Sequence, residues 1–154
     1  MPLHIALFEP EIPPNTGNII RLSANTGVVL HLIHPLGFSL NERDLRRAGL
    51  DYHEWARCIE HANFSDFLAQ LPGRLFAFTT KAPGLFTEAA FEENDTLLFG
   101  PESRGLPLDV LSKLPESHWL RIPMLPHSRS LNLSNAVAVA VYEALRQGGF
   151  NELS

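Results

Sequence analysis

Serine, arginine and asparagine crowd the start of a predicted C-terminal helix, in the run "SRSLNLSN" at residues 128–135 that follows the Pro-punctuated "RIPMLPH". The first turn of a helix presents backbone N–H groups without partners, and these groups bind carboxylate or phosphate. One capping residue would be enough to start a helix, so the additional polar side chains indicate a bound ligand. The run therefore predicts a ligand site at the start of this helix.

Two further polar loops follow short apolar runs, "FTTK" at 78–81 and "GPESRGLP" at 100–107. Gly100 and Gly105 allow backbone to approach a ligand closely. Loops that follow parallel strands gather at the carboxyl edge of the sheet, where ligands bind. We therefore expect loops 78–81, 100–107 and 123–134 to line one shared pocket, although each loop alone is also explained as a plain turn.

Several site classes have no motif in the sequence. The chain lacks the glycine-rich dinucleotide and P-loop patterns and the G-x-S-x-G elbow. Its seven histidines show no metal-ligand spacing, so no metal is expected. His4 and His31 lie inside predicted strands as structural residues, whereas His34 and His127 lie in predicted loops and are site candidates. Cys58 is the single cysteine, which fits inert packing in a reducing cytoplasm.

The elements that must position these loops alternate between strand and helix. Apolar, β-branched runs predict strands at residues 3–8, 28–33, 74–80, 96–100 and 118–123. Helices are predicted at residues 15–27, 41–50, 64–71, 108–114 and 132–147, and residues 81–95 are expected to form a loop. Pro10, Pro13 and Pro14 predict an extended loop before the first helix. This order is typical of one α/β domain with a parallel sheet.

Charge is distributed unevenly along the 154 residues. The net charge of −5 argues weakly against a non-specific nucleic-acid binder. A local basic cluster at Arg43, Arg46 and Arg47 could nevertheless follow RNA phosphates, with Tyr52 and Trp55 nearby to stack on an unpaired base. A solvated helix with Trp55 in the core explains the cluster equally well. The apolar runs are too short to span a membrane.

Three segments, "PEIPPNTGNIIRLSANTG", "LLFGPESRGLP" and "IPMLPHSRSLNLSNAVAVAVYEALRQ", resemble the three motifs of the SPOUT, or α/β-knot, RNA ribose methyltransferases. The resemblance extends over nearly the whole chain. We expect no appended RNA-binding domain. The resemblance is therefore strongest to the minimal tRNA (cytidine/uridine-2′-O)-methyltransferases, which act on the wobble nucleotide of leucine tRNAs. It implies a single domain over residues 1–154, a parallel sheet with helices on both faces, and a C-terminal trefoil knot.

The resemblance also implies a cofactor, a partner and a location. S-adenosylmethionine would lie bent in the knot, and two chains would pair mainly through their first and last helices. The substrate would be the anticodon loop of a tRNA in the cytoplasm, with no membrane and no metal. Carried over position by position, the cofactor contacts would be Phe78, Thr79, Gly100, Glu102, Ile122, Ser130, Leu131 and Asn132.

The implied reaction is methyl transfer to a ribose 2′-hydroxyl. The family's proposed base corresponds to Arg21, but a guanidinium is not deprotonated in proteins, so clamping the neighbouring phosphate is the alternative role. Asn15 would bond the ribose or orient Arg21, Glu102 would fix Arg21 or the substrate, and Asn132 would line the transfer path. Helix capping is the competing explanation for Asn15 and Asn132.

Three other functions fit parts of the sequence. A related enzyme would use the same cofactor on another tRNA or rRNA position. A knotted RNA-binding module would keep the fold without the chemistry, although the joint presence of Asn15, Arg21, Glu102 and Asn132 argues against it. A flavodoxin-like nucleotide binder would fit the α/β pattern alone.

Overall fold

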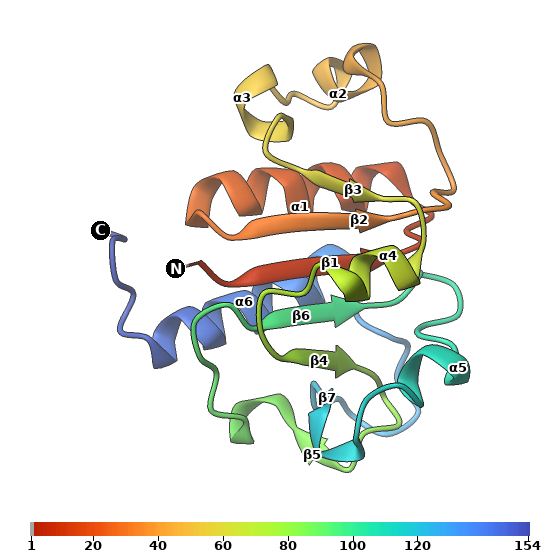
Figure 1. Ribbon diagram of the computed structural model, residues 1–154, viewed down its shortest axis with the longest axis vertical. Helices are drawn as coiled ribbons and strands as arrows, with labels where there is room; N and C mark the ends of the chain where they lie inside the picture. Colours follow the sequence, from red (N-terminus) through yellow and green to blue (C-terminus); the bar gives the residue numbers. More distant parts are fainter. Residues whose placement is uncertain (1) are drawn as a thin grey trace.

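The computed structural model describes residues 2–154 and contains one seven-stranded parallel sheet with the strand order β3-β2-β1-β6-β4-β7-β5 (Figure 1). The strands are β1 (His4–Phe8), β2 (Val29–Ile33), β3 (Ile59–His61), β4 (Leu75–Phe78), β5 (Gly84–Leu85), β6 (Thr96–Phe99) and β7 (Trp119–Arg121). The helices are α1 (Pro13–Thr26), α2 (Glu42–Arg47), α3 (Tyr52–Trp55), α4 (Phe64–Ala69), α5 (Leu108–Leu111) and α6 (Leu133–Gln147), with short 3₁₀ turns η1 (Phe86–Glu88) and η2 (Glu116–His118).

Alternating side chains of the central strands supply two hydrophobic layers. Ile5 and Leu7 of β1 point into one buried cluster with side chains of α1 and α6. Ala6 and Phe8 of the same strand point into a second cluster with side chains of α4 and α5. Because successive residues of a strand face opposite sides, a fully apolar strand must be covered on both.

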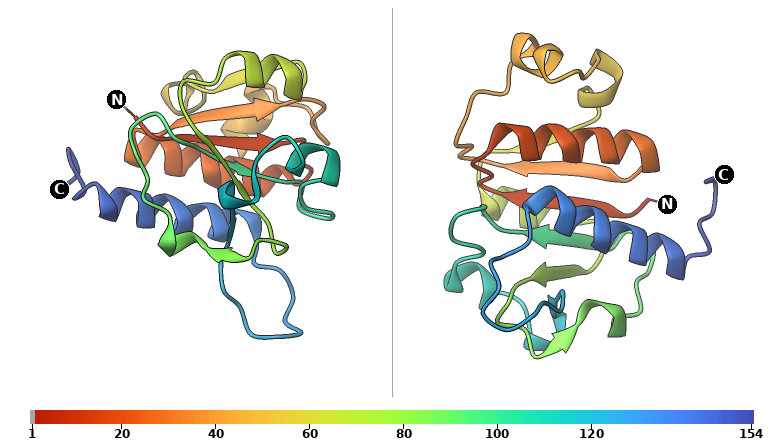
Figure 2. Two further views of the ribbon diagram at one scale, coloured as in Figure 1. Left: turned by 60° about the horizontal axis from the view of Figure 1, so that its bottom comes forward. Right: turned by 180° about the vertical axis from the view of Figure 1, so that it is seen from behind.

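Helices lie on both faces of the sheet, as predicted. Helices α1 and α6 lie side by side on one face, and α4 covers the other (Figures 1 and 2). The buried stripe of α6 consists of Val137, Ala140, Val141 and Ala144. Their spacing is that of a helix, although apolar residues alternate in the sequence as they would in a strand. The parallel α/β fold is confirmed, and the trefoil knot stays a prediction. Within residues 2–154, no helix has both the length and the apolar character needed to cross a membrane.

The start of α1 differs from the prediction. Pro13 and Pro14 are the first two residues of the helix rather than part of an extended loop. The first turn of a helix needs no N–H hydrogen bonds, and the fixed φ of proline suits it, so two prolines are tolerated there. Gly27 ends the helix in the left-handed conformation with φ of 78°, as its position predicted.

Residues 35–58 form a lobe above the edge of the sheet (Figure 1). The predicted helix 41–50 ends earlier, at Arg47, and a short helix that was not predicted, α3, follows it. Leu45 and Leu50 are buried in the α1 side of the core and attach the lobe. The other elements not predicted are the 3₁₀ turns η1 and η2 and the short edge strands β3 and β5. Each of these strands contains too few residues to show a strand pattern.

Three histidines form a buried row across neighbouring strands. His4, His31 and His61 lie on β1, β2 and β3, on the face covered by α4, and each is at most 9% exposed. His4 Nδ1 lies 2.9 Å from His31 Nε2, and His31 Nδ1 lies 2.9 Å from His61 Nε2. A neutral imidazole has one donor and one acceptor nitrogen, so the row is satisfied when all three rings are neutral. His4 and His31 are therefore structural residues, as predicted.

We expect this row to make folding stability depend on pH. Burial, with the nearby His4 and His61, lowers the pKa of His31 to about 4, and burial also lowers the pKa of His4 and of His61, where Asp66 partly opposes the shift. The unfolded chain binds protons near pH 6.5, so stability is full above that pH and falls as pH drops toward 4. The His31 contribution lost by pH 5 is about 2 kcal/mol, measurable by urea unfolding at pH 7.5 and 5.

Two variants separate this effect from the carboxylates. His31→Gln should reduce the difference in unfolding free energy between the two pH values, because the glutamine amide does not titrate. His53→Gln changes an exposed histidine of α3 and should leave the difference unchanged. Equal pH dependence in His31→Gln and the unmodified protein would contradict the prediction.

Candidate active site

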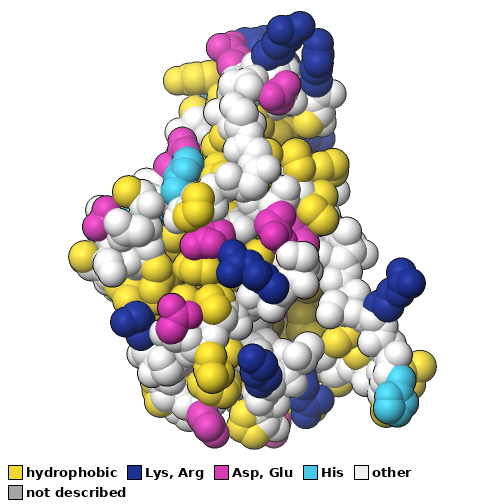
Figure 3. Space-filling model, turned by 90° about the vertical axis from the view of Figure 1, so that its right-hand side faces the viewer, with side chains coloured by type: hydrophobic (Ala, Val, Ile, Leu, Met, Phe, Trp, Pro, Cys, Tyr) yellow, Lys and Arg dark blue, Asp and Glu magenta, His cyan; other side chains and the backbone are white. Residues whose placement is uncertain are grey.

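A cavity of about 520 Å³ lies where loops following β4, β6 and β7 meet the starts of α1 and α6. This is the carboxyl edge of the sheet, toward which the strand arrowheads of Figure 1 point and which Figure 3 faces. The loop between β7 and α6 projects away from the body of the molecule (Figure 2). The three polar loops therefore do converge on one pocket, as their positions after parallel strands predicted.

The cavity brings together most of the predicted site residues. All eight predicted cofactor contacts line it, and so does Asn15. Apolar residues such as Phe99 and Leu106 line the cavity together with polar residues such as Thr79 and Ser130. Among the predicted catalytic residues, Arg21 is the exception, because it does not line the cavity within one chain.

An amide chain joins three of the predicted catalytic residues. Asn132 Nδ2 donates to Asn15 Oδ1 over 3.0 Å, and Asn15 Nδ2 donates to Glu102 Oε2 over 3.1 Å. Asn132 also caps α6, since its Oδ1 accepts from the backbone N–H of Asn135. Asn15, only 5% exposed, lies inside α1 and is not its cap. Capping therefore accounts for one function of Asn132 and does not explain Asn15.

Within one chain, Glu102 forms hydrogen bonds to the start of α1 and not to Arg21. Its Oε1 accepts from the backbone N–H of Glu11 at 2.8 Å, and its Oε2 accepts from that of Ile12 at 2.9 Å. Helix α1 has no side-chain cap of its own. A carboxylate at this end satisfies free N–H groups and complements the helix dipole.

Two more contacts join the same two segments, residues 9–12 and residues 100–105. Glu11 accepts hydrogen bonds from both the backbone N–H and the hydroxyl of Ser103, and these bonds lower the pKa of Glu11. Arg104 forms an ion pair with Glu9 at 2.7 Å. These carboxylates fix one wall of the cavity. Loop 100–107 was expected in that wall from its place after a strand, whereas only the motif resemblance pointed to the start of α1.

Arg21 lies on the exposed side of α1, beneath the lobe. Its Nε donates to Glu54 Oε2, and its Nη2 donates to Glu54 Oε1 at 3.3 Å and to the carbonyl of Gly49 at 2.6 Å. The Arg21 side chain is nevertheless 49% exposed. The structure therefore separates Arg21 from the Asn132–Asn15–Glu102 chain and places it between α1 and the basic lobe.

The predicted RNA-binding residues lie on α2 at the tip of the lobe. Arg43, Arg46 and Arg47 are all exposed, and Lys and Arg side chains gather at the top of Figure 3. Arg46 pairs with Glu42 at 2.6 Å and lies 5.9 Å from the centroid of the Trp55 ring. Trp55 packs partly against the core, as the alternative explanation of the cluster expected, and its stacking on an RNA base stays a prediction.

The remaining candidates contribute little to this site. His34 pairs with Glu60 at 2.7 Å, and His127 lies in the projecting loop with φ of 65°. Burial raises the pKa of Cys58 to about 12, which agrees with an inert packing residue. Among the described residues, no group of three or more His, Cys, Asp or Glu side chains could hold a metal ion.

Sequence reasoning missed several residues that complete the cavity and its surroundings. Lys81, Arg104 and Met124 line the cavity within the loops that were expected to do so, but none of them was singled out as a site residue. Glu54 did leave a signal, because "DYHE" has the spacing of a capping box, and Asp51 and Glu54 form one at the start of α3. That pattern predicts a helix start and does not predict a contact with Arg21.

The cavity has the properties of a small-molecule site. Its volume falls within the range of about 300–1,000 Å³ that is usual for ligand pockets, and its walls combine apolar surface with a few polar groups. Gly100 allows one wall to close on itself, since a Cβ there would lie 2.3 Å from the backbone nitrogen of Leu106. A nucleoside-sized ligand with a ring and polar ends would fit this chemistry.

Comparison with known proteins adds independent observations. A model of the SpoU rRNA Methylase family matches residues 2–142. A tRNA (cytidine(34)-2'-O)-methyltransferase from Saccharophagus degradans is 59% identical over 148 residues, 96% of each chain. A solved structure that concerns 2-OH methylation of C/U34 on tRNA has a TM-score of 0.88 and 50% identity, and the match covers 97% of both chains. An AdoMet-bound rRNA methyltransferase from Sinorhizobium meliloti shares the fold, with a TM-score of 0.81 and 23% identity over 94% of this chain and 56% of that one.

Proposed function

The chain belongs to the SpoU rRNA methylase family and is a methyltransferase, and from this premise we propose that it methylates the ribose 2′-hydroxyl of nucleotide 34 in tRNA. The main support is near full-length similarity to a tRNA (cytidine(34)-2'-O)-methyltransferase at 59% identity. The cavity adds support, because the three motifs that carry the resemblance meet there.

We propose S-adenosylmethionine as the methyl donor. Phe78, Ile122 and Leu131 would contact its apolar parts, and the backbone of the loop at Gly100 would approach it closely. When bound, it supplies a methyl group already activated on a sulfonium. The AdoMet-bound rRNA methyltransferase from Sinorhizobium meliloti, which shares the fold, supports this choice of methyl donor at the level of the fold.

The chain's own residues then have two tasks. Asn132, Asn15 and Glu102 hold the starts of α6 and α1 against the cavity, so that donor and ribose are kept in line, and alignment is a large part of catalysis for an activated methyl. Arg21 would hold the phosphate next to the target ribose through a charge-assisted hydrogen bond. Solvent would receive the proton that leaves the 2′-oxygen, so no side chain needs to act as a base.

The finer substrate assignment is also a proposal. We infer that the target is the wobble nucleotide, cytidine or modified uridine, in the anticodon loop of leucine tRNAs in the cytoplasm. The family resemblance supports this assignment, and recognition would rest on this one domain of residues 1–154. An unpaired loop suits the enzyme because its ribose and bases are accessible to protein side chains.

We further propose a homodimer formed by α1 and α6. Val139 and Tyr142 on α6 are each 45% exposed, and Ile12 before α1 is also 45% exposed. Apolar side chains gathered near two adjacent helices are typical of a surface that a partner covers. In such a dimer Arg21 of one chain would lie near the cavity of its partner, which would explain its absence from the cavity wall here.

The decisive experiment is incubation with labelled S-adenosylmethionine and total tRNA from a strain lacking the gene, followed by mapping of the methylated nucleoside. Label in 2′-O-methylated cytidine or uridine at position 34 of leucine tRNA supports the proposal. Label at another tRNA or rRNA position would identify the related enzyme instead, and cofactor binding without transfer would identify a non-catalytic module.

Charge reversal on α2 tests the proposed RNA surface. Arg47→Glu should weaken tRNA binding by about tenfold and reduce the slope of log affinity against log salt by about one, because one phosphate contact is lost. Fluorescence titrations of labelled tRNA at several salt concentrations provide the measurement.

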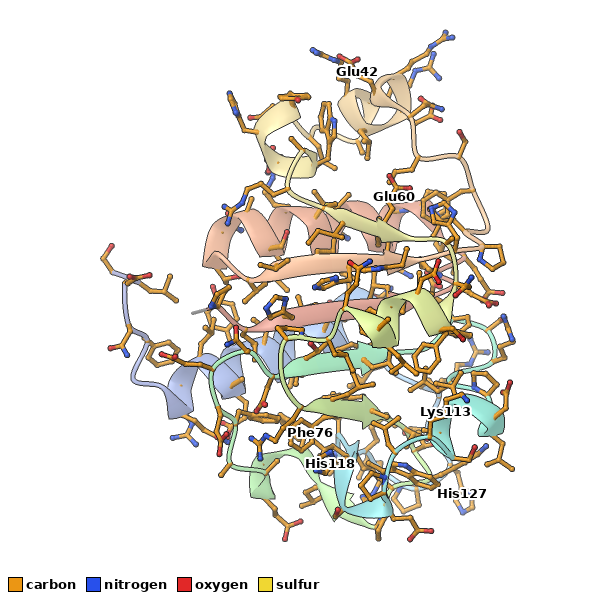
Figure 4. All side chains as sticks on the ribbon, in the orientation of Figure 1. Glu42, Glu60, Phe76, Lys113, His118 and His127 are labelled. Atoms are coloured by element: carbon orange, nitrogen blue, oxygen red, sulfur yellow. The ribbon has the colours of Figure 1, made fainter. Side chains whose placement is uncertain are left out.

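Lys113→Glu is the matched control, since it makes the same change in charge. Figure 4 places Lys113, just after α5, far from Glu42 of α2. This variant should retain the unmodified salt slope. Identical slopes for Arg47→Glu and the unmodified protein would remove α2 from the RNA surface.

A further inference from the structure

Glu54 holds Arg21 with both of its carboxylate oxygens. Oε2 accepts from Arg21 Nε, and Oε1 accepts from Arg21 Nη2 at 3.3 Å. The Glu54 side chain is only 14% exposed, whereas the Arg21 side chain is 49% exposed. The guanidinium is therefore fixed on its inner edge and open to solvent on its outer edge.

The hydrogen bonds of Arg21 leave one specific nitrogen free. A guanidinium has five N–H groups. Glu54 and the carbonyl of Gly49 use the Nε–H and both N–H groups of Nη2. Among residues 2–154, the two N–H groups of Nη1 have no hydrogen-bond partner. These two N–H bonds diverge in the plane of the guanidinium, and each can donate to a phosphate oxygen.

Glu54 is itself fixed by the basic lobe. Its Oε1 also accepts from the backbone N–H of Asp51 at 3.0 Å, which is half of the α3 capping box. Gly49 lies in the turn that joins α2 to α3, so both partners of Arg21 belong to the lobe that carries the basic helix. The Arg21 guanidinium is therefore a polar link between α1 and the lobe, in addition to the apolar contacts of Leu45 and Leu50.

We propose that Glu54 is the positioning residue for Arg21, and that it holds the Arg21 Nη1 donors, from the lobe that carries α2, at the substrate phosphate. This inference rests on the proposed function. An isolated surface ion pair contributes little to stability, so the two-oxygen contact with a third bond to Gly49 has its value in orientation.

The central test is Glu54→Gln, which keeps the side-chain shape and an oxygen for the Asp51 N–H but removes the charge. We expect kcat for tRNA methylation to fall by about 10- to 100-fold, the cost of a misplaced catalytic group. KM for tRNA should change less than threefold, because the α2 arginines remain. The Kd for S-adenosylhomocysteine should also change less than threefold, because neither Glu54 nor Arg21 lines the cavity of its own chain.

Asp51→Ala is the matched control for damage to α3. It removes the other half of the capping box, the bond from the Glu54 N–H to Asp51 Oδ1, and leaves the Glu54–Arg21 contact in place. We expect its kcat to stay within threefold of the unmodified enzyme. An equal loss of kcat in both variants would show that Glu54 acts only through the fold of the lobe.

A readout independent of turnover is the NMR signal of the Arg21 side-chain Nε–H. In the unmodified protein this proton should exchange slowly with water, and in Glu54→Gln it should exchange at least tenfold faster. Glu54→Asp serves if the Gln variant does not fold, since the shorter side chain cannot hold both contacts and should give the same two changes.

The outcomes separate this inference from the proposed function. If the unmodified enzyme methylates position 34 and Glu54→Gln matches its kcat and its exchange rate, the positioning role is wrong and the function stands. If the unmodified enzyme methylates no tRNA, the function is wrong, and the exchange measurement still decides whether Glu54 orders Arg21.

Discussion

Arg21→Ala is expected to lower the rate of tRNA methylation by about 1,000-fold, a loss typical of removing a fixed cationic donor at a reacting group. The Kd for S-adenosylhomocysteine should stay within a few-fold, because Arg21 does not line the cavity of its own chain and is proposed to hold the substrate phosphate rather than the cofactor. Single-turnover methylation of tRNA and calorimetric titration of the cofactor product measure the two quantities separately.

Arg146→Ala is a suitable control for the loss of an ion pair. Arg146 pairs with Glu143 on α6, with side chains 62% and 11% exposed, close to the 49% and 14% of the Arg21–Glu54 pair. Its activity should remain near that of the unmodified enzyme. If Arg21→Ala loses cofactor binding and its activity falls only in proportion to that loss, Arg21 contributes to cofactor binding and not to contact with the substrate phosphate.

A second variant of Arg21 distinguishes a role as a base from a role as a phosphate clamp. Arg21→Lys should not recover activity at high pH, because the three bonds to Glu54 and Gly49 define Arg21 as a fixed donor. Lysine cannot reproduce the fork geometry that holds it. A rise in activity through the range where lysine loses its proton would favour a proton acceptor.

Strands and loop positions could be predicted because they depend on local pattern. Runs such as "LHIALF" and "TLLFG" are long enough to identify buried strands, and parallel topology then places their following loops at one edge. The contacts that give those loops their shape were not predictable. Asn132 and Asn15 are 117 positions apart, and no feature of either segment alone specifies that their amides meet.

Arg21 illustrates this difference most clearly. Its position in the first motif identified it as a site residue, but its partners come from residues 49 and 54, on a lobe whose second helix was not predicted. The capping box at Asp51 and Glu54 was present in the sequence, yet a cap uses only part of a carboxylate. Which cation the Glu54 carboxylate also binds depends on how the lobe packs against α1, which is a tertiary property.

Gly100→Ala is expected to destroy cofactor binding. The new Cβ would lie 2.3 Å from the backbone nitrogen of Leu106 and 2.4 Å from the carbonyl carbon of Gly105, and neither backbone atom can move without opening loop 100–106. Because that loop forms a wall of the cavity, the Kd for S-adenosylhomocysteine should rise at least about 100-fold, and stability should fall by about 1–3 kcal/mol, as for other overpacked sites.

Gly84→Ala provides the comparison, because its Cβ would meet only Glu88 Oε1, at 4.0 Å. That variant should bind the cofactor normally and unfold at a nearly unchanged temperature. Near-normal cofactor binding by Gly100→Ala would mean that loop 100–106 opens without affecting the ligand, and the cavity could then not be the methyl-donor site. The close approach at Gly100 thus links the packing of one loop directly to the proposed chemistry, independently of any assignment for Arg21.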